Sequence, residues 1–337
     1  MSLVVVDADV LGRRRTGDET YVLNLLRHLP AAAAGRLRFA ALTRRPDLVP
    51  EGIEAVYVPA RFQELRMSWS VPRGLRKLRP ALAHFQHALP LGCPCPAVVT
   101  IHDLSFERDP SVMPFHDRLV FKTVVPRSAR RAAHVLAVSA RTKADIVELY
   151  GIPAVKITVT PNGADPAFSP GDGDRSEYVL LVGSVEKRKN PLAAAAAASE
   201  VGLPLVVAGP VRDTELAREL ERRGAQLRGY VAQEELIALY RDAACLVMPS
   251  RYEGFGLPVL EAMASGTPVV AAPDAALREV AGEAAVFVEP ERLADGVRQA
   301  LTDRERLVAT GLRRARAFSW EETARRTVAV YLEVLAA

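Results

Sequence analysis

The chain has 337 residues, of which 49% are apolar and 25% charged, and it carries a net charge of +4 with a pI near 9.0. This length favours two globular domains, and the composition is ordinary for a soluble globular protein. Its apolar runs are shorter than the roughly 18 residues of a transmembrane helix, so a membrane-spanning segment is excluded.

The first residues and the cysteines bear on the compartment. Residues 2–7 are apolar without a basic region before them, so we expect a core strand and not a signal peptide. The three cysteines, Cys93, Cys95 and Cys245, match neither a disulfide framework nor a metal-ligand pattern. We therefore expect a reduced, cytoplasmic chain.

Strand-like and helical patterns alternate in the first half of the chain, which is typical of a parallel sheet covered on both faces. A polar loop is predicted at residues 8–20 and is followed by a helix with Tyr21, Leu25 and Leu29 on one stripe. No G-x-G-x-x-G motif follows the first strand, which argues against a nicotinamide-dependent dehydrogenase. The predicted strands lie at 2–7, 38–43, 53–58, 81–85, 97–101, 134–138 and 157–160, and the clearest later helices at 112–131 and 140–149.

A second alternation of strands and helices follows a turn-rich stretch at 163–176, which we interpret as an interdomain linker. Its predicted strands lie at 177–183, 203–208, 226–229, 244–248, 268–272 and 285–288. Its predicted helices lie at 190–200, 213–223, 233–243, 258–265 and 290–302, before a last helix that begins near Trp320.

The stretch from Pro249 to Ala262 joins a buried strand to a helix and carries two glutamates, Glu253 and Glu261. Pro258 suits the first turn of a helix, so the amides near Phe255, Gly256 and Leu257 are expected at the helix start, where an anion can bind. A carboxylate on each side of a phosphate would accept hydrogen bonds from sugar hydroxyls. This stretch predicts a nucleotide-sugar site.

Other strand ends are expected at the same edge of the second sheet. Gly183 and Ser184 precede the basic pair Arg188 and Lys189, whose charge suits a diphosphate. Gly209 and Val231 follow two further strands and offer backbone groups to a nucleobase, although ordinary turns are an equal interpretation.

Polar residues also end strands in the first half. His102 is expected at the edge of a cleft, where it could hold a sugar hydroxyl or a phosphate. His84 and His87 are expected to point into the same space, with an acceptor-side role and a structural role both open. No cluster with metal-ligand spacing is present, so no metal site is predicted.

The segment 71–80 holds Arg73, Arg76, Lys77 and Arg79 among apolar residues, and prolines bound it. It is a candidate for peripheral contact with a membrane, although its expected length is below two helical turns. Nucleic acid is not an expected partner, because no basic stripe interleaves with aromatic residues.

The chain resembles the retaining glycosyltransferases of family 4, also called glycosyl transferases group 1, which have the GT-B fold. The most specific element is the E-x7-E motif from Glu253 to Glu261, in an ordered set that covers nearly the whole chain. The matching segments are the Gly17 loop, Thr100–Leu104, Val138–Ser139, Pro161–Asp165, Val182–Gly183, Glu186–Asn190 and Phe318–Trp320.

The resemblance implies two Rossmann-like α/β domains with doubly wound parallel sheets that face a cleft. We expect an acceptor-binding domain at 1–165, a nucleotide-sugar-binding domain at 166–317, and a helix at 318–337 that crosses back to the first domain.

The resemblance also implies residue roles. Glu253 would contact the donor sugar, Glu261 the ribose, and Arg188 with Lys189 the diphosphate, so that neither a metal nor a cofactor is required. His102 would lie near the transferred sugar. The predicted catalytic residues are His102, Glu253, Arg188 and Lys189. The predicted donor-binding residues are Gly17, Gly183, Ser184, Gly209, Val231, Gly254, Phe255, Gly256, Leu257 and Glu261.

GDP-mannose is the favoured donor, with UDP- and dTDP-sugars as alternatives. The acceptor is a hydroxyl of a glycan, a lipid-linked glycan or a small molecule, and the oligomeric state is open. The cytoplasmic chain would carry out polysaccharide or glycoconjugate synthesis, and the inner membrane face is a candidate location for it.

Two departures from the family pattern keep other functions open. Ser184 stands where many members have arginine, and Asp18 with Glu19 follow Gly17 where many have a small residue. The acidic pair favours a catalytically silent sugar-nucleotide-binding subunit as one alternative. A GT-B phosphorylase or a sugar-nucleotide epimerase is the other.

Overall fold

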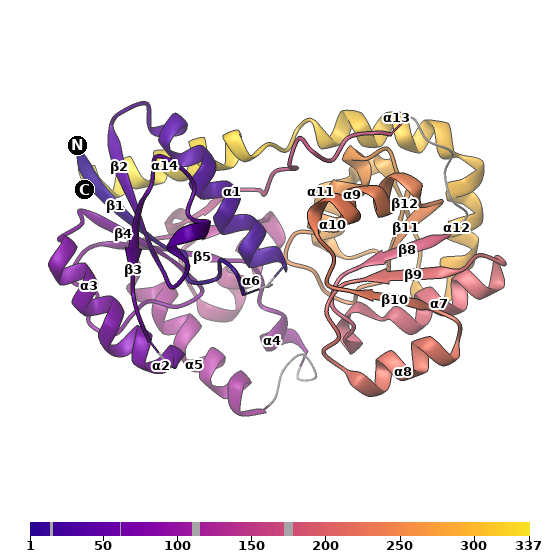
Figure 1. Ribbon diagram of the computed structural model, residues 1–337, viewed down its shortest axis with the longest axis horizontal. Helices are drawn as coiled ribbons and strands as arrows, with labels where there is room; N and C mark the ends of the chain where they lie inside the picture. The colour runs from indigo at the N-terminus through magenta and orange to yellow at the C-terminus, as the bar shows by residue number, and fades with distance from the viewer. Residues whose placement is uncertain (14–15, 61, 110–114, 172–177) are drawn as a thin grey trace. The chain divides into compact units, whose positions relative to one another are not determined.

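The computed structural model describes residues 1–13, 16–60, 62–109, 115–171 and 178–337, and internal contacts divide the chain into two units (Figure 1). The first unit comprises Met1–Leu104, Phe115–Gly163 and Trp320–Ala337, and the second comprises Ser105–Pro114 and Ala164–Ser319. No helix of the described residues is long and apolar enough to cross a bilayer.

The first unit is built on a seven-stranded sheet with the order β3-β2-β1-β4-β5-β6-β7, and every neighbouring pair is parallel. The order reverses between β1 and β4, which is the topology of a doubly wound α/β sheet. The strands are β1 (Ser2–Asp7), β2 (Leu37–Thr43), β3 (Glu54–Tyr57), β4 (Leu82–Gln86), β5 (Ala97–Ile101), β6 (His134–Ala137) and β7 (Ile157–Val159).

Helices cover both faces of this sheet (Figure 1). The α-helices of the unit are α1 (Thr16–Ala33), α2 (Gln63–Leu65), α3 (Val71–Leu78), α5 (Phe115–Arg131), α6 (Ala140–Tyr150) and α14 (Trp320–Ala336). Short 3-10 turns lie at η1 (Pro46–Leu48) and η3 (Ala154–Lys156), and a π-helical turn, η2 (Arg66–Ser70), joins α2 to α3.

A buried hydrogen-bond chain fixes the last helix to this sheet. The Nδ1 atom of His84 lies 2.6 Å from the hydroxyl of Tyr331 on α14, and its Nε2 atom lies 2.7 Å from Oγ1 of Thr100 on β5. Thr100 in turn lies 3.0 Å from the hydroxyl of Tyr21 on α1. Burial lowers the pKa of His84 to about 3, so the ring is neutral and bonds in both directions.

The second unit holds a six-stranded parallel sheet with the order β10-β9-β8-β11-β12-β13. This order is the doubly wound 3-2-1-4-5-6 pattern, and its switch point lies between β8 and β11. The strands are β8 (Val179–Val182), β9 (Leu205–Ala208), β10 (Gln226–Gly229), β11 (Cys245–Met248), β12 (Val269–Ala271) and β13 (Ala285–Phe287).

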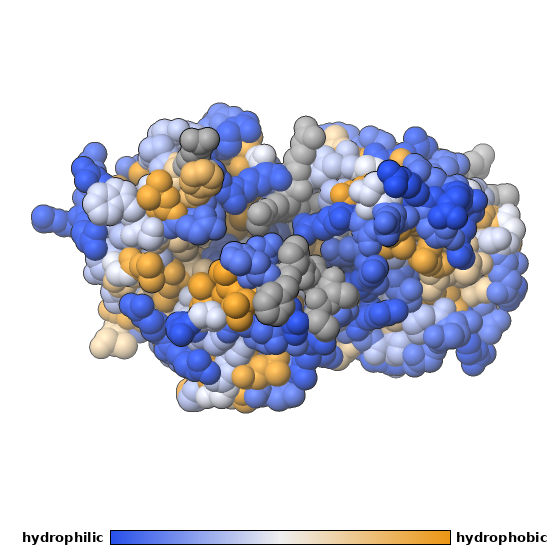
Figure 2. Space-filling model, turned by 90° about the horizontal axis from the view of Figure 1, so that it is seen from below, coloured by the Kyte–Doolittle hydropathy of each residue, from blue (hydrophilic) through white to orange (hydrophobic). Residues whose placement is uncertain are grey.

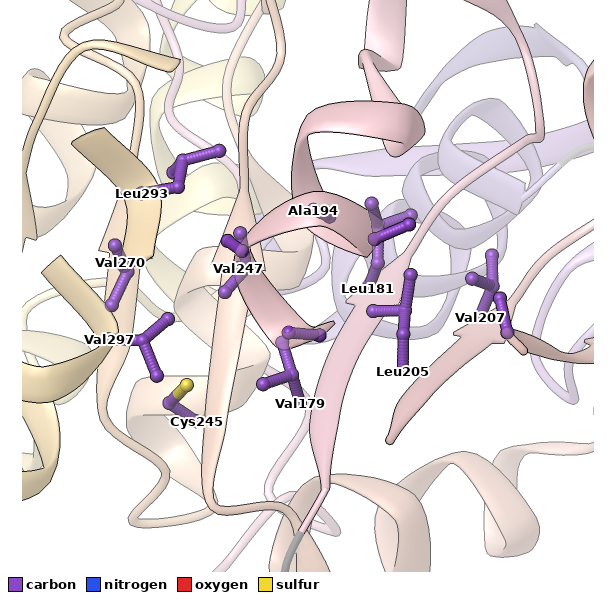
Figure 3. Close-up of a cluster of buried hydrophobic side chains, with 14 of the residues drawn as sticks. Val179, Leu181, Ala194, Leu205, Val207, Cys245, Val247, Val270, Leu293 and Val297 are labelled. Atoms are coloured by element: carbon purple, nitrogen blue, oxygen red, sulfur yellow. The ribbon is translucent and has the colours of Figure 1, made fainter. Parts of the chain in front are cut away.

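The core of the second unit lies between this sheet and the helices of one face (Figure 3). Side chains of β8, β9, β11 and β12 meet Ala194 of α7 and Leu293 and Val297 of α12. The helices of the unit are α4 (Ser105–Arg108), α7 (Pro191–Glu200), α8 (Thr214–Arg222), α9 (Gln233–Asp242), α10 (Leu257–Ala264), α11 (Ala275–Ala281), α12 (Leu293–Thr302) and α13 (Arg304–Ala315), with short turns η4 (Lys187–Lys189), η5 (Gly282–Ala284) and η6 (Pro290–Arg292).

The two parallel α/β sheets confirm the fold predicted from the sequence. Three local predictions were wrong. The loop predicted at 8–20 ends earlier, because α1 begins at Thr16. The short basic segment 71–80 belongs to a longer helical stretch that begins at Gln63. His84 is fully buried in the hydrogen-bond chain above, so it does not face an acceptor.

Parts of two predicted segments lie outside the described residues. They are residues 112–114 of the helix predicted at 112–131 and residues 172–176 of the linker predicted at 163–176.

The hydrogen-bond chain predicts that Tyr331→Phe destabilises the protein. The substitution leaves Nδ1 of His84 buried without a partner, so the free energy of unfolding should fall by about 1–3 kcal/mol. Chemical denaturation measures the loss. The control is Tyr57→Phe on β3, where the side chain is exposed and the change should be near zero. Equal stability of Tyr331→Phe and wild type would contradict a stabilising role for the chain.

Candidate functional site

The candidate donor site lies at the carboxyl ends of the strands of the second sheet. Gly183 follows β8 with φ of 147°, and Gly209 follows β9 with φ of 151°. A Cβ atom on Gly209 would overlap the carbonyl group of Gly183, so this close backbone approach requires glycine. The amide of Gly183 donates to the carbonyl of Ala208 at 2.9 Å, and the amide of Gly209 donates to the carbonyl of Gly229 at 2.7 Å. Backbone hydrogen bonds therefore connect the ends of β8, β9 and β10.

Two segments meet at the switch point, where β8 pairs with β11. Lys189 ends the turn η4 beyond β8, and Glu253 lies in the loop beyond β11. The Nζ atom of Lys189 donates to Oε1 of Glu253 at 2.6 Å. Both side chains are buried, with exposed fractions of 9% for Lys189 and 6% for Glu253.

Arg188 strengthens the same junction. Its Nη1 atom donates to the carbonyl of Tyr252 at 2.7 Å and lies 3.6 Å from Oε2 of Glu253. Its Nη2 atom donates to Oε1 of Glu186 at 2.8 Å, and its carbonyl accepts from the amide of Arg251 at 3.0 Å. Two cations and two carboxylates therefore neutralise one another here.

The pKa of Glu253 follows from this arrangement. Burial by itself raises the pKa of the carboxyl group, but the charges of Lys189 and Arg188 outweigh burial and hold it below the usual value. Glu253 is therefore ionised at neutral pH.

The segment between the two glutamates is held close to its helix. Gly254, Phe255 and Gly256 are buried, and α10 begins at Leu257 with Gly256 as its N-cap. Gly256 has φ of 109°, which favours glycine, and a Cβ atom there would lie 2.7 Å from the end of the Leu277 side chain, which would have to move. Among the described residues no side chain caps this helix start, so it retains the character of an anion site.

Glu261 lies inside α10 and differs from Glu253 in its surroundings. It is buried, and Oε2 accepts a hydrogen bond from the hydroxyl of Tyr240 at 2.9 Å. Burial raises the pKa of Glu261 to about 7; the bond from Tyr240 works against this rise, and the charge of Asp165 adds to it. One glutamate of the pair is thus firmly ionised, and the other changes charge near neutral pH.

Ser184 and Val231 complete the donor-binding residues predicted for the second unit. Ser184 is half-buried directly after Gly183, and Val231 is half-buried beyond the end of β10. The roles assigned to both toward a nucleotide stay predictions.

The first unit contains His102 and Gly17. The Nε2 atom of His102, directly after β5, lies 2.9 Å from Oε1 of Gln86, the last residue of β4. Tyr21 packs its ring edge against His102, with ring centroids 4.7 Å apart. Gly17 is exposed in the first turn of α1. The predicted roles of His102 and Gly17 toward the donor stay predictions.

His102 has neighbours that the sequence analysis did not assign to it. Among the described residues, Asp18, His87 and His102 offer ligand atoms that lie within 4.8 Å of one another. Burial lowers the pKa of His102 to about 4, against the opposing charges of Asp18 and Asp103. The ring is therefore neutral at physiological pH. In the sequence Asp18 directly follows Gly17 and lies far from His102. Only the fold brings the Asp18 carboxylate close to the His102 ring.

The raised pKa of Glu261 predicts a specific pH dependence of stability. The unfolded chain releases this proton near pH 4.5 and the folded chain near pH 7, so the contribution of Glu261 to the free energy of unfolding falls as pH rises between these values. Glu261→Gln keeps an acceptor for Tyr240 and removes the titration. Relative to wild type, the variant should gain up to roughly 3 kcal/mol between pH 5 and pH 8.

Thermal unfolding of ligand-free protein across this pH range measures the difference. Glu234→Gln, an exposed position on α9, is the matched control and should show none. A difference between Glu261→Gln and wild type that does not change with pH would contradict the assignment.

Comparisons with known proteins agree with this geometry. The family described as "Glycosyltransferase Family 4" matches residues 15–168, and "Glycosyl transferases group 1" matches residues 167–314. The O-antigen chain mannosyltransferase B of Escherichia coli is 32% identical over 265 residues, which cover 70% of each chain. The MMP alpha-(1->4)-mannosyltransferase of Mycolicibacterium hassiacum is 33% identical over 245 residues, which cover 64% of this chain and 58% of that protein.

Solved structures share the fold over almost the whole chain. Sucrose-phosphate synthase from Thermosynechococcus elongatus superposes with a TM-score of 0.81 at 20% identity and 100% coverage of both chains. Anabaena HepE, solved in complex with UDP and glucose, superposes with a TM-score of 0.76 at 15% identity, covering 99% of this chain and 100% of that one. The family matches, the close relative and the shared fold together establish that the chain belongs to the group 1 glycosyltransferases of family 4.

Proposed function

We propose that this chain is a retaining hexosyltransferase that moves a sugar from a nucleotide diphosphate sugar to a hydroxyl acceptor, with GDP-mannose as the favoured donor. The buried contact of Lys189 and Arg188 with Glu253, at the switch point of the second sheet and in the loop that leads to α10, carries the proposal. The two mannosyltransferase relatives support mannose, and the UDP complex of Anabaena HepE keeps a UDP-sugar as the alternative.

The chemistry assigned to the site follows from its charges. Cleavage of the bond between the sugar and the diphosphate leaves negative charge on the departing phosphate oxygen. Arg188, Lys189 and the amides at the start of α10 are the groups that would stabilise this charge. Glu253 would accept hydrogen bonds from the donor sugar, and Glu261 from the ribose.

The ligand-free site suits an exchange of partners. Lys189 is held by Glu253 and Arg188 by Glu186, so neither cation is unbalanced before the donor arrives. A bound diphosphate would take over part of the cationic charge, and sugar hydroxyls would replace the bonds that Glu253 gives up. This exchange avoids a buried cluster of unpaired positive charge.

The front-face route is favoured for a retaining transfer. In this route the leaving phosphate accepts the proton of the acceptor hydroxyl as the new bond forms on the same face of the sugar. Glu253 is bound to two cations, which lowers its strength as a nucleophile. His102, which is neutral, would contribute hydrogen bonds near the transferred sugar and not a positive charge.

The proposal assigns the neutralisation of the diphosphate to Arg188 and Lys189, so it requires no divalent cation. Full turnover after treatment with EDTA is expected.

The catalytically silent alternative loses part of its support. The carboxylate of Glu19 accepts a hydrogen bond from the amide of Gly12 at 2.6 Å, so it has a local role in the first loop. Asp18 lies beside His102, where its charge partly offsets the lowering of the pKa of that ring by burial. Neither contact requires the loss of activity.

The donor assignment predicts selective thermal stabilisation by a nucleotide sugar. In a panel of GDP-, UDP-, dTDP- and ADP-sugars, one donor at 100 times its Kd should stabilise the protein by about 2.7 kcal/mol. A panel without any shift would count against the donor site.

Lys189→Met tests the diphosphate assignment. Loss of the cation should lower donor turnover by roughly 10²-fold or more. Lys187→Met is the matched control, because Lys187 is exposed in the same short turn and should retain turnover. Because Lys189→Met removes the nearer of the two cations that face buried Glu253, the double variant with Glu253→Gln serves as the folding control. Wild-type turnover in folded Lys189→Met would overturn the assignment.

A further inference from the structure

A helical segment at residues 63–78, formed by α2, η2 and α3, has two faces of different character. Its inner face holds Arg66, Val71 and Leu75, which are fully buried. The guanidinium of Arg66 donates from Nη1 to Oδ2 of Asp7 at 3.1 Å and also pairs with Asp9. These buried contacts attach the segment to the end of β1 and determine which of its faces points to solvent.

The opposite face exposes large apolar side chains and then basic ones. Phe62, Leu65 and Trp69 have exposed fractions of 59%, 48% and 63%. Arg73 and Arg76 are exposed at the next positions of the same helical spacing. We call these five residues the docking stripe.

A neighbouring loop extends the stripe. The amide of Leu91 donates to the carbonyl of Met67 at 3.1 Å, which places the loop against η2, and the Leu91 side chain is 65% exposed. A Cβ atom on Gly92 would lie 3.6 Å from Nη2 of Arg76, so an apolar and a basic side chain lie close together here. Figure 2 shows apolar residues set among hydrophilic ones on the face of the molecule seen from below.

Four large apolar side chains exposed together on one face are unusual for a water-facing surface. The charge of the neighbouring side chains indicates which kind of surface binds to these apolar groups. Exposed Arg73, Arg76, Lys77 and Arg79 outnumber the single exposed carboxylate of the segment, that of Glu64. Apolar side chains bordered by cations fit the interface of an anionic lipid bilayer, where the rings enter the headgroup region and the cations meet lipid phosphates.

We propose that the docking stripe, with Leu91, holds this protein against the surface of a membrane that contains anionic lipids. Docking does not rest on the proposed glycosyl transfer, because it requires no donor. If both hold, the membrane would present the acceptor hydroxyl on a lipid-anchored molecule and bring it to the first domain.

Co-sedimentation of the purified full chain with vesicles tests the proposal. Vesicles of phosphatidylcholine with one third phosphatidylglycerol should bind the wild type, and vesicles of phosphatidylcholine alone should bind it at least tenfold less. Phe62→Ser with Trp69→Ser should weaken binding by roughly tenfold or more through lost apolar burial. Arg73→Glu with Arg76→Glu should weaken it by roughly 30-fold or more and reduce its dependence on salt.

Matched controls separate the stripe from general effects. Val155→Ser removes an apolar side chain that is 88% exposed elsewhere in the first unit, and the double variant Arg218→Glu with Arg222→Glu makes the same charge change on α8. Both should bind as wild type does. Each variant must keep the wild-type unfolding temperature and its thermal shift with the donor, which separates loss of docking from loss of folding or of donor binding.

Two results would overturn the proposal. One is equal binding of anionic vesicles by the wild type and by both stripe variants. The other is a wild type that ignores vesicles but dimerises in analytical ultracentrifugation, with Phe62→Ser and Trp69→Ser making it monomeric. The second result would assign the stripe to contact with a second copy of the chain.

Discussion

The buried ion pair between Lys189 and Glu253 joins the two halves of the second sheet at its switch point. One partner follows β8 and the other follows β11, and Arg188 ties the same two loops together through the carbonyl of Tyr252. Burying charges is costly, and well-packed apolar residues often stabilise a protein as well as a buried ion pair does. The pair is therefore weak evidence for stability, and the roles in binding and chemistry proposed above give it a different reason.

The two glutamates of the E-x7-E motif illustrate how one sequence motif provides two chemical environments. Glu253 faces cations and keeps its charge. Glu261, which lies in α10, accepts a hydrogen bond from the hydroxyl of Tyr240 and holds its proton up to about pH 7. The two glutamates are eight positions apart in the sequence, but their partners come from different segments. The same separation of acid and base strength is what an active site requires when it handles groups of different charge.

The sequence was sufficient to predict the fold because its signals are local. Apolar runs predicted both sheets, and the glycines around Gly256 marked the close approach that the backbone makes. Partners that lie far apart in the sequence could not be predicted in the same way. The bond of His84 to Tyr331 joins residues 247 positions apart, and no local pattern around His84 indicates that the side chain is buried.

The helical segment at 63–78 shows a further limit. The sequence predicts a segment of under two helical turns bounded by Pro72 and Pro80. The structure instead places a π-helical turn before it, with the amide of Val71 donating to the carbonyl of Arg66. Because of this wider turn the helical stretch continues past Pro72 without a break. Phe62, Leu65 and Trp69 therefore share a face with the arginines that follow. For the site residues, the sequence predicted which ones end strands at the same edge, but not that Lys189 and Glu253 would be paired before a donor binds.

The most direct test of the central claim is a crystal structure of the protein with the nucleotide sugar that stabilises it most. The account predicts diphosphate density within hydrogen-bond distance of Lys189 and Arg188 at the start of α10, and ribose hydroxyls at Glu261. Density for the diphosphate at any other place, with Lys189 still bound to Glu253, would contradict it.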